Sequence, residues 1–486
     1  MPSDRPNILL ICTDQQRYDA LGCYGNDAIE TPTIDGLASD GMRFERCYVQ
    51  SPVCAPSRAS LLTGQYVQNH GLWANGVPLP DQARLFTRDL ADAGYDCGLI
   101  GKMHLAAAFE GRTEPRYDDG FRVYRWSHDP SHGSPDNAYH HWLEREHPDL
   151  YRRAVAARTG EGDGSVTFDD MPTEAHSTRW TAEEAIAFLG EGRDPAKPFF
   201  LQVNFYDPHH PFVAPPDYLD RYDPATLLRP LVDAMGPDTK PSIQREASRE
   251  SYAGHAPGFA AYTSDEIQEI VRAYYAMVTF IDDEVRRILD RLDALGLRDD
   301  TVVIFTSDHG EMLGDHGLLL KGPFMYEGAV RVPLIIRWPG RLPSGERRSE
   351  LVQWIDLAPT ILRLAGINPP RTFQGDDLLP LARGDDDARD RGWAICQYLN
   401  SGHPYDPPVL VTMLRTDRYK LIVLHGPPAT DRPREGELYD LDADPDELVN
   451  LWDEPESAPI RVELERRLID ILVATTDRSQ PREAPW

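Results

Sequence analysis

The sequence predicts an α/β protein: a large, mostly parallel mixed sheet sandwiched by helices, followed by a small C-terminal antiparallel α+β subdomain. Three observations support this prediction. Short apolar runs alternate with longer segments of helical periodicity, and each of these runs ends in a polar cluster. Beyond residue 385 the pattern changes to closely spaced strand-like runs. With 486 residues, the chain is long enough for one large domain and an appendage.

Four apolar runs are predicted to be buried parallel strands. They cover residues 7–12, 97–100, 198–204 and 301–306. The carboxyl ends of parallel strands meet at one edge of a sheet, so the polar residues that follow these runs are expected to lie close together. The candidate site residues in these positions are Asp14, Gln15, Lys102, His104, His209, Asp308 and His309.

The segments between the strands contain one clear helix and two long insertions. Apolar residues recur at helical spacing from 265 to 295, which predicts a long amphipathic helix. Residues 127–164 and 215–258 are rich in polar residues, Gly or Pro and are predicted to be irregular. Such loops over a rigid sheet either shape specificity or are surface excursions without a role.

The acidic run at 384–387 marks the predicted domain boundary. It divides the chain into a catalytic domain, residues 1–384, and a C-terminal subdomain, residues 385–486. Strand-like runs at 393–398, 409–414 and 419–423, followed by a helix near 460–472, predict the antiparallel α+β subdomain.

Charge and cysteine usage exclude several classes of function. Acidic residues outnumber basic ones by 79 to 50, and a formal charge of −29 repels nucleic acid and anionic membranes, so neither is an expected partner. Six scattered cysteines without a CxxC pair predict reduced thiols rather than a disulfide framework. The chain as given shows no signal peptide and no membrane-spanning run, so we expect a cytoplasmic protein.

Residues 51–64, SPVCAPSRASLLTG, form the most specific motif. Pro56 and the small residues around it favour a helix N-terminus, where free backbone N–H groups and the helix dipole stabilise an anion near Cys54. Spacing alone leaves open the alternative of a cysteine packed in an ordinary loop-to-helix turn.

This segment resembles the signature of the type I, formylglycine-dependent sulfatases of the alkaline phosphatase superfamily. In that family the Cys or Ser of C-x-P-S-R, followed by a Leu-Thr-Gly tail, is oxidised to formylglycine by a dedicated generating enzyme. The resemblance runs from the first strand and Asp14 to the closing residues 438–451, nearly the whole chain. It implies the alkaline phosphatase-like fold and a sulfuric ester hydrolase that cleaves a sulfate monoester to alcohol and sulfate. The expected cytoplasmic location favours a small imported ester over a sulfated polymer. Cys54 would be the modified nucleophile.

The resemblance also implies one divalent cation. Its ligands would be Asp14, Gln15, Asp308, His309 and modified Cys54. Many family members carry Asp-Asp and Asp-Asn at the two adjacent pairs, whereas Asp-Gln and Asp-His resemble choline sulfatases and phosphonate monoester hydrolases. Oxygen ligands suit Ca²⁺ or Mg²⁺ and an imidazole favours Mn²⁺, so the identity of the metal stays open.

The remaining catalytic residues follow from matching positions. The resemblance implies catalytic roles for Cys54, Arg58, Lys102, His104, His209, Asp308 and Lys321, with Asp308 as the base, and substrate contacts for Asn75, Lys102, His209 and Lys321. Asn75 could equally be a turn residue before a glycine, and His210 is interpreted as structural. The chain has only five lysines, at 102, 197, 240, 321 and 420, so two of them at family positions indicate a need for a compact ammonium.

Two other functions are alternatives to a sulfatase. A phosphonate monoester or phosphodiester hydrolase would use the same nucleophile and metal set, but those enzymes carry neutral Tyr and Thr where this chain has Lys102 and His104. An inactive binding homologue would show losses at catalytic positions, and none is seen.

The natural ester and the oligomeric state stay open. Sulfated monosaccharides and aryl or alkyl sulfates are as compatible with the sequence as a choline ester, for which Trp126, Tyr139 and Trp142 could build an aromatic face. Simple packing is the more common role of such an aromatic group in an insertion. The expected partners are the small sulfate ester and the formylglycine-generating enzyme, and a homo-oligomer is compatible with the sequence.

Overall fold

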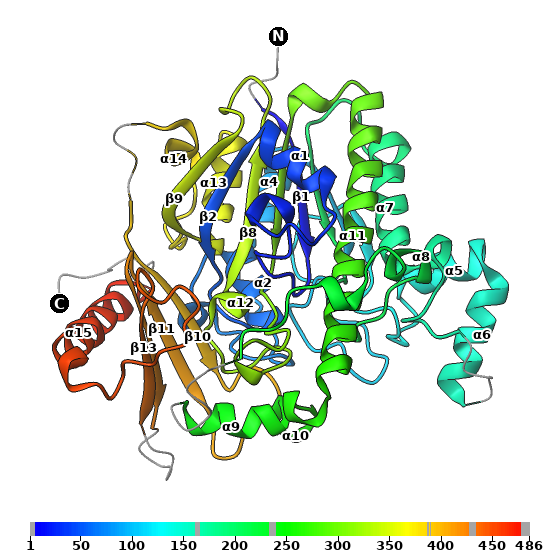
Figure 1. The fold of residues 1–486 in the computed structure, drawn as a ribbon. Helices are drawn as coiled ribbons and strands as arrows, with labels where there is room; N and C mark the ends of the chain where they lie inside the picture. Colours follow the sequence, from blue (N-terminus) through cyan, green and yellow to red (C-terminus); the bar gives the residue numbers. More distant parts are fainter. Residues whose placement is uncertain are drawn as a thin grey trace.

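The computed structural model describes residues 5–160, 166–232, 240–385, 388, 390–426 and 434–477. Within these residues the strands form an eight-stranded sheet and a four-stranded sheet. Helices cover both faces of the larger sheet, and the smaller sheet lies beside it (Figure 1). The predicted fold class is therefore confirmed.

The large sheet has the order β4-β3-β5-β1-β7-β8-β2-β9. Neighbours among β4, β3, β5, β1 and β7 run parallel, whereas β8 is antiparallel to both β7 and β2. The four predicted strands are β3, β5, β1 and β7, and they lie side by side. The strands of this sheet are β1 (Asn7–Thr13), β2 (Met42–Tyr48), β3 (Asp96–Gly101), β4 (Val123–Trp126), β5 (Phe199–Asn204), β7 (Thr301–Ser307), β8 (Arg331–Arg337) and β9 (Glu346–Gln353).

Alternate side chains of each central strand enter different hydrophobic clusters, because successive residues of a strand point to opposite faces. Ile8 and Leu10 of β1 belong to one cluster, and Leu9 and Ile11 belong to the other. Helices α2 (Cys54–Thr63), α4 (Phe86–Asp92) and α13 (Leu357–Leu364) cover the first face, and α1 (Pro32–Asp40), α7 (Ser177–Ala187) and α11 (Ser264–Ala294) cover the second. The central strands are thus buried on both sides, as their uniformly apolar sequences predict.

The long helix predicted at 265–295 is α11. It starts in a capping box, in which Glu266 N–H donates to Thr263 Oγ1 at 3.3 Å and Thr263 N–H donates to Glu266 Oε2 at 2.7 Å. Within the described residues, no helix is both long and apolar enough to cross a bilayer.

Both insertions contain helices, so the prediction that they are irregular is wrong in part. In the first insertion, α5 (Ala138–Glu146) and α6 (Pro148–Thr159) occupy most of the length. Tyr139, Trp142 and Leu143 of α5 are buried, and this helical spacing was obscured by the polar composition around it. The second insertion contains α8 (Pro216–Leu219), α9 (Ser242–Arg249), the single turn α10 (Ser251–Gly254) and the two-residue strand β6 (Ala256–Pro257). Residues 161–165 lie outside the described part of the chain.

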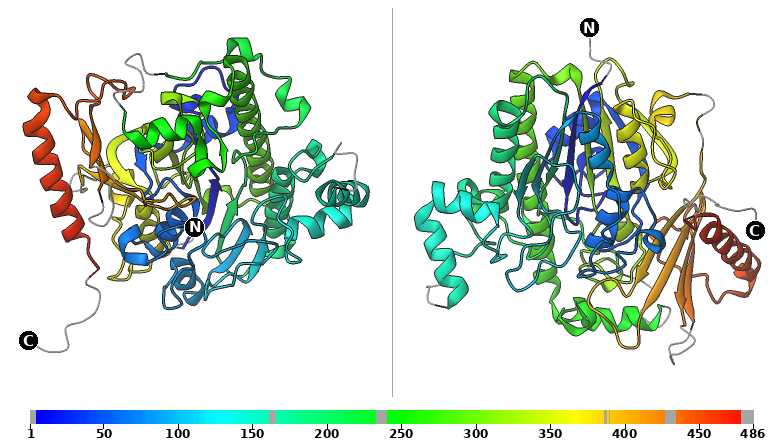
Figure 2. Two further views of the ribbon diagram at one scale, coloured as in Figure 1. Left: turned by 90° about the horizontal axis from the view of Figure 1, so that it is seen from below. Right: turned by 180° about the vertical axis from the view of Figure 1, so that it is seen from behind.

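The C-terminal subdomain is an antiparallel sheet of order β10-β11-β12-β13 with one helix packed against it (Figure 2). Its strands are β10 (Ala394–Leu399), β11 (Leu410–Arg415), β12 (Tyr419–His425) and β13 (Glu435–Asp440), and α15 (Ala458–Ala474) covers its outer face. The inner face joins the same hydrophobic cluster as the large sheet, through Tyr398, Val411 and Met413. The prediction of this subdomain is confirmed, except that β13 was not expected to be a strand.

We propose 384/385 as the domain boundary, since α14 (Leu379–Arg383) ends just before it and β10 begins at Ala394. Asp386 and Asp387 of the acidic run lie outside the described residues. Because the two sheets share one hydrophobic cluster, the second unit is a packed subdomain rather than a separate body. The remaining short helices of the described chain are α3 (Val67–His70) and α12 (Glu327–Val330).

Candidate active site

Neighbouring strands bring the candidate residues to one edge of the large sheet. Asp14 follows β1, Lys102 follows β3, His209 lies beyond β5 and Asp308 follows β7. Helix α2 begins at Cys54 and is buried along its whole length, so the free N–H groups of its first turn lie in the interior. The polar clusters that follow the four apolar runs therefore meet around Cys54.

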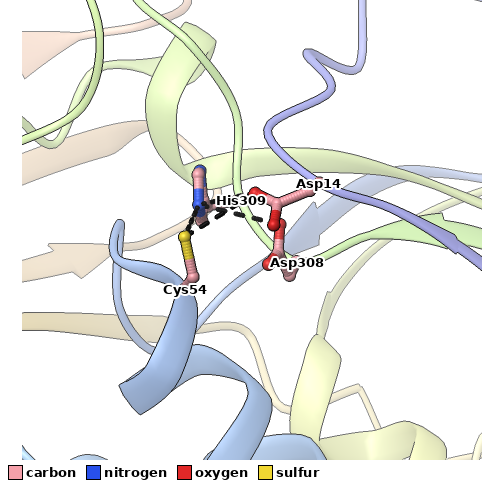
Figure 3. A group of neighbouring side chains, drawn as sticks. All are labelled: Asp14, Cys54, Asp308 and His309. Carbon is pink, nitrogen blue, oxygen red and sulfur yellow. Dashed lines mark hydrogen bonds and ion pairs between the residues drawn. The ribbon is translucent and has the colours of Figure 1, made fainter. Parts of the chain in front are cut away.

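Four buried side chains form a candidate metal centre (Figure 3). One ligand atom from each of Asp14, Cys54, Asp308 and His309 lies within 4.8 Å of the others. Cys54 Sγ is 3.0 Å from His309 Nε2 and 3.6 Å from Asp14 Oδ1. His309 Nδ1 lies 2.9 Å from the Gly310 carbonyl oxygen and donates to it, so Nε2 is the ring nitrogen that faces the carboxylates.

Gln15 lies beside this cluster in a left-handed conformation, with a φ of 70°. Its backbone N–H donates to Asp308 Oδ1 at 3.1 Å. Its side-chain oxygen accepts a hydrogen bond from Lys321 Nζ at 2.6 Å, and its side-chain nitrogen donates to Glu311. The amide of Gln15 is therefore turned toward Lys321 and Glu311 in this structure.

Cationic side chains surround the carboxylates. Arg58 Nε donates to Asp308 Oδ2 at 2.7 Å, and its Nη2 lies 3.3 Å from Asp14 Oδ2. Lys102 Nζ donates to Asp14 Oδ2 at 2.7 Å, and Lys321 Nζ lies 3.0 Å from Cys54 Sγ. A buried carboxylate stays ionised only when it is paired in this way.

The charges control the protonation of the cluster. Burial alone would raise the pKa of Asp14, but the charges of Lys102, Arg58 and Lys321 lower the pKa well below its ordinary value. Burial and Asp14 would raise the pKa of Cys54, yet the surrounding cations lower it overall. The site therefore favours negative charge at position 54.

Two histidines complete the site. His209 Nδ1 donates to the His210 carbonyl oxygen at 2.7 Å, which leaves Nε2 as the nitrogen available to a ligand. Burial lowers the pKa of His209 well below its ordinary value, and the charge of Lys321 lowers it further. Burial, followed by the charge of Lys102, does the same to His104. Both imidazoles are therefore neutral before an anion binds.

A cavity of about 610 Å³ opens above these groups, a volume typical of small-molecule sites. Its walls include six of the candidate residues: Cys54, Asn75, Lys102, His104, His209 and Lys321. Asp14, Gln15, Arg58, Asp308 and His309 are buried and do not line the cavity. The cavity thus leads to Cys54 from outside, while the carboxylates approach it from inside.

Asn75 connects the cavity to helix α2. Its Oδ1 accepts a hydrogen bond from Ala55 N–H at 3.1 Å, which fixes the first turn of α2 directly after Cys54. Its backbone N–H donates to the Ser401 carbonyl oxygen at 2.9 Å, in the loop after β10. Asn75 is therefore more than a turn residue before a glycine.

The three aromatic residues considered for a choline ester pack in the interior and form no face for a substrate. Trp126, Tyr139 and Trp142 are buried and do not line the cavity. Tyr139 and Trp142 pack in the core on one face of α5, and the Trp126 indole N–H donates to Glu114 Oε1 at 2.7 Å. The rings that do line the cavity come from separate segments and were missed: Phe109, Tyr206, Tyr252, Tyr398 and Tyr405.

Glu114 is a second residue that sequence reasoning missed. Its buried carboxylate accepts hydrogen bonds from the backbone N–H groups of His104 and Leu105, each at 2.9 Å, and from the Trp126 indole. His104 has a φ of 63°, so this carboxylate holds a strained loop in place. No pattern in the sequence links Glu114 to that loop.

Comparisons with known proteins identify the family. The family model "Sulfatase" matches residues 6–367, and the model "N-sulphoglucosamine sulphohydrolase, C-terminal" matches residues 314–474. The chain is 31% identical to the uncharacterized sulfatase YidJ of Escherichia coli, over 96% of this chain and 87% of that protein. It is 29% identical to the choline-sulfatase of Rhizobium meliloti, over 94% of this chain and 84% of the relative.

Among solved structures, the chain is similar to the phosphonate monoester hydrolase of Agrobacterium radiobacter. The TM-score is 0.81 at 26% identity, and the match covers 98% of this chain and 97% of the other. The chain therefore belongs to the sulfatase family of the alkaline phosphatase superfamily and is a sulfate-ester hydrolase. The phosphonate monoester hydrolases are related superfamily members.

Proposed function

We propose that this sulfatase cleaves a small sulfate monoester, with Cys54 converted to formylglycine as its nucleophile and with one divalent cation. The observation that carries the proposal is the buried cluster of Asp14, Cys54, Asp308 and His309, whose ligand atoms lie within 4.8 Å of one another at the floor of the cavity. The formylglycine-generating enzyme is the proposed maturation partner.

The donor set fits a divalent cation. Two buried carboxylates and one imidazole nitrogen face a common point, and Gln15 beside them is the proposed further ligand together with residue 54. Such mixed oxygen and nitrogen donors suit Ca²⁺, Mn²⁺ or Mg²⁺. When bound, the cation would offset the charge of the sulfuryl oxygens and make a hydroxyl at position 54 more acidic.

The roles of the side chains follow from their contacts. Formylglycine, when formed and hydrated, supplies an oxygen nucleophile at position 54. Asp308 Oδ2 is held by the charged Arg58 guanidinium, whereas Oδ1 accepts the backbone N–H of Gln15, so Oδ1 is the atom proposed to accept the proton of the attacking hydroxyl. The contacts of Arg58 go to Asp14, Asp308 and the Lys102 carbonyl oxygen, so its proposed role is to hold the carboxylates while their charge is offset.

The remaining groups act on the sulfate. Lys102 and Lys321 line the cavity on either side of Cys54 and are proposed to stabilise the sulfuryl oxygens. An anionic ester beside His209 favours the imidazolium form of His209. The imidazolium would then donate its Nε2 proton to the departing oxygen, assisted by Lys321. His104 is proposed to remove a proton from residue 54 afterwards, which releases sulfate and restores the aldehyde.

A phosphonate monoester or phosphodiester hydrolase is the second candidate, favoured by the structural similarity to phosphonate monoester hydrolases. Lys102 and His104 at the cavity wall favour a sulfate monoester instead. We also propose a cytoplasmic location, because all six cysteines are free thiols, which suits a reducing compartment.

The test is hydrolysis by protein produced together with a formylglycine-generating enzyme. We expect turnover of 4-nitrophenyl sulfate to exceed turnover of a 4-nitrophenyl phosphonate ester, and both activities to disappear in Cys54→Ala. A higher kcat/KM for the phosphonate ester would favour the second candidate. Activity that survives in Cys54→Ala would overturn the nucleophile.

A further inference from the structure

The turn that carries Tyr252 is held by hydrogen bonds between the residues before it and the residues after it. Glu250 and Ser251 form antiparallel bridges with Pro257 and Ala256, and Gly258 N–H donates to the Arg249 carbonyl oxygen at 3.1 Å. These contacts close residues 249–258 into a pinned loop below the large sheet (Figure 1).

The helix before this loop is attached to the C-terminal sheet. Ser242 N–H donates to Glu435 Oε2 at 3.1 Å, and Gln244 Nε2 donates to Glu437 Oε2 at 2.8 Å, both on β13. Helix α9 therefore anchors the second insertion to the subdomain, and the position of the loop is set by both parts of the molecule.

The tip of the loop has an unfavourable backbone. Tyr252 and Ala253 have φ values of 53° and 54°, in the left-handed region that residues with a side chain rarely adopt. Two such residues in succession persist only where the surrounding structure holds them, and strain of this kind is concentrated at ligand clamps and active sites. The Tyr252 hydroxyl is buried without a hydrogen-bond partner among the described residues, so hydrogen bonding does not explain the tyrosine either.

The ring of Tyr252 lines the cavity above Cys54 and continues a row of rings. Its centroid lies 5.5 Å from that of His210 and 5.4 Å from that of His403, in the loop between β10 and β11. His210 stacks on His209 at 4.0 Å. The row therefore starts at the proposed proton donor, where the leaving oxygen would lie, and extends along the cavity wall.

We propose that the ring of Tyr252, supported by His210 and His403, is the specificity-determining surface for the alcohol part of the ester. The favoured substrates then carry a flat or ring-shaped alcohol, either an aromatic ring or the apolar face of a pyranose, rather than an acyclic chain. This inference rests on the proposed function, since it uses the same cavity and the same position of the sulfate.

The test measures binding in a Cys54→Ala background, so that it does not depend on turnover. Calorimetry would compare 4-nitrophenyl sulfate, a pyranose 6-sulfate, propyl sulfate and inorganic sulfate with and without the additional change Tyr252→Leu. We expect Tyr252→Leu to weaken binding of one or both ring-bearing esters about tenfold and to leave propyl sulfate and inorganic sulfate within about twofold. If Tyr252→Leu weakens the binding of only one ring-bearing ester, that ester carries the kind of ring that the surface accepts.

Two further variants separate the ring from general damage to the fold. Tyr252→Phe keeps the ring and should retain the preference for ring-bearing esters, and Tyr419→Leu in β12, remote from the cavity lining, should not alter that preference. Equal losses for all four ligands in Tyr252→Leu, or no loss for any, would overturn the inference. Failure of the proposed function appears separately, as absence of hydrolysis by the mature enzyme with Tyr252 intact.

Discussion

Lysine in this chain is a residue of the interior. Of the five lysines, four are buried, at positions 102, 240, 321 and 420, and only the side chain of Lys197 is more than half exposed. The buried ammonium groups contact carboxylates, tyrosine hydroxyls or Cys54. A compact ammonium fits where a planar guanidinium does not. This explains why these positions carry lysine, although most basic residues of the chain are arginine.

Replacing Lys102 by arginine should therefore damage catalysis. Lys102→Arg keeps the charge but cannot keep a single point contact with Asp14 and a second contact in the cavity. We expect kcat/KM for 4-nitrophenyl sulfate to fall about 100-fold, the usual effect of losing one group that stabilises a transition-state oxyanion. The matched change Lys197→Arg at the surface should leave kcat/KM unaltered. Similar kinetics for the two variants would remove Lys102 from the mechanism.

Asp207 provides a pH-dependent contribution to stability. Burial raises the pKa of its carboxyl to about 7, and Thr178 donates a hydrogen bond to it at 2.5 Å. The folded protein binds this proton more tightly than the unfolded chain, where the pKa is about 3.9. Its stabilisation is therefore complete below about pH 4 and is lost as the pH rises through 7.

Asp207→Asn should remove that dependence. Between pH 4 and pH 8, the free energy of unfolding of the parent protein should fall by up to about 4 kcal/mol relative to Asp207→Asn. Urea unfolding at several pH values measures the difference, with Asp118→Asn, whose side chain is 80% exposed, as the control. Parallel pH profiles for the parent and Asp207→Asn would show that the carboxyl is ionised in the fold.

At the scale of single residues, the sequence predicts the position of a site residue when that residue belongs to a local motif. Cys54 could be placed at a helix start from Pro56 and its neighbours, and α2 does begin there. Tyr252 and Glu114 could not be placed, because their importance depends on contacts with residues far away in the sequence. Gln15 was found by its position after a strand, but the direction of its amide toward Lys321 depends on a partner 306 residues away.

Among the elements, uniformly apolar strands were the easiest to predict. β1, β3, β5 and β7 are buried on both faces and read as continuous apolar runs. β9 begins with exposed charged residues at the edge of the sheet, and β2 has a register shift near charged residues, so neither reads as a strand. The helices of the first insertion were missed because few of their positions are buried.

One buried ion cluster joins β12 to the large domain. Lys420 Nζ lies 2.6 Å from both Glu327 and Glu447, and all three side chains are buried. Burial would raise the pKa of Glu327, but Lys420 and two arginines lower it, whereas burial raises the pKa of Glu447 to about 7. The single ammonium of Lys420 therefore pairs with two carboxyl groups that differ in pKa.

Lys420→Met should destabilise the fold by roughly 3–5 kcal/mol, because it removes the ammonium that pairs with the buried Glu447 carboxylate. Arg418→Met in the turn before β12 removes an ion pair whose arginine is more than half exposed, so it should have little effect on the free energy of unfolding. Chemical denaturation of both variants measures the difference. A loss of similar size in both would mean that the buried cluster does not join the two parts.

On the scale of the whole molecule, the proposed active site is built from segments of both sheets. The large sheet supplies the carboxylates, and the cavity wall is completed by residues of the second insertion and of the loop after β10. The fold class could be predicted from alternating strands and helices. The contact between Asn75 and the loop after β10 could not be predicted, because it depends on how the C-terminal subdomain packs against the large domain.

Metal binding should stabilise the entire fold. Two buried carboxylates gain a cation only in the folded state, so Ca²⁺ or Mn²⁺ added after chelation should raise the unfolding temperature. At a free metal concentration 100 times the Kd, the gain is about 2.7 kcal/mol. Asp14→Asn should lose most of this response, and Asp118→Asn should keep it. Identical thermal shifts in both variants would place the metal elsewhere.

The most direct test of the central claim is the mass of the peptide that contains residue 54, measured together with specific activity. Protein would be prepared with and without the formylglycine-generating enzyme, to give a range of conversion. We expect sulfate-ester hydrolysis to rise in proportion to the fraction of chains that carry the aldehyde and to be absent at zero conversion. Full activity in preparations whose residue 54 is entirely cysteine would contradict the proposed chemistry.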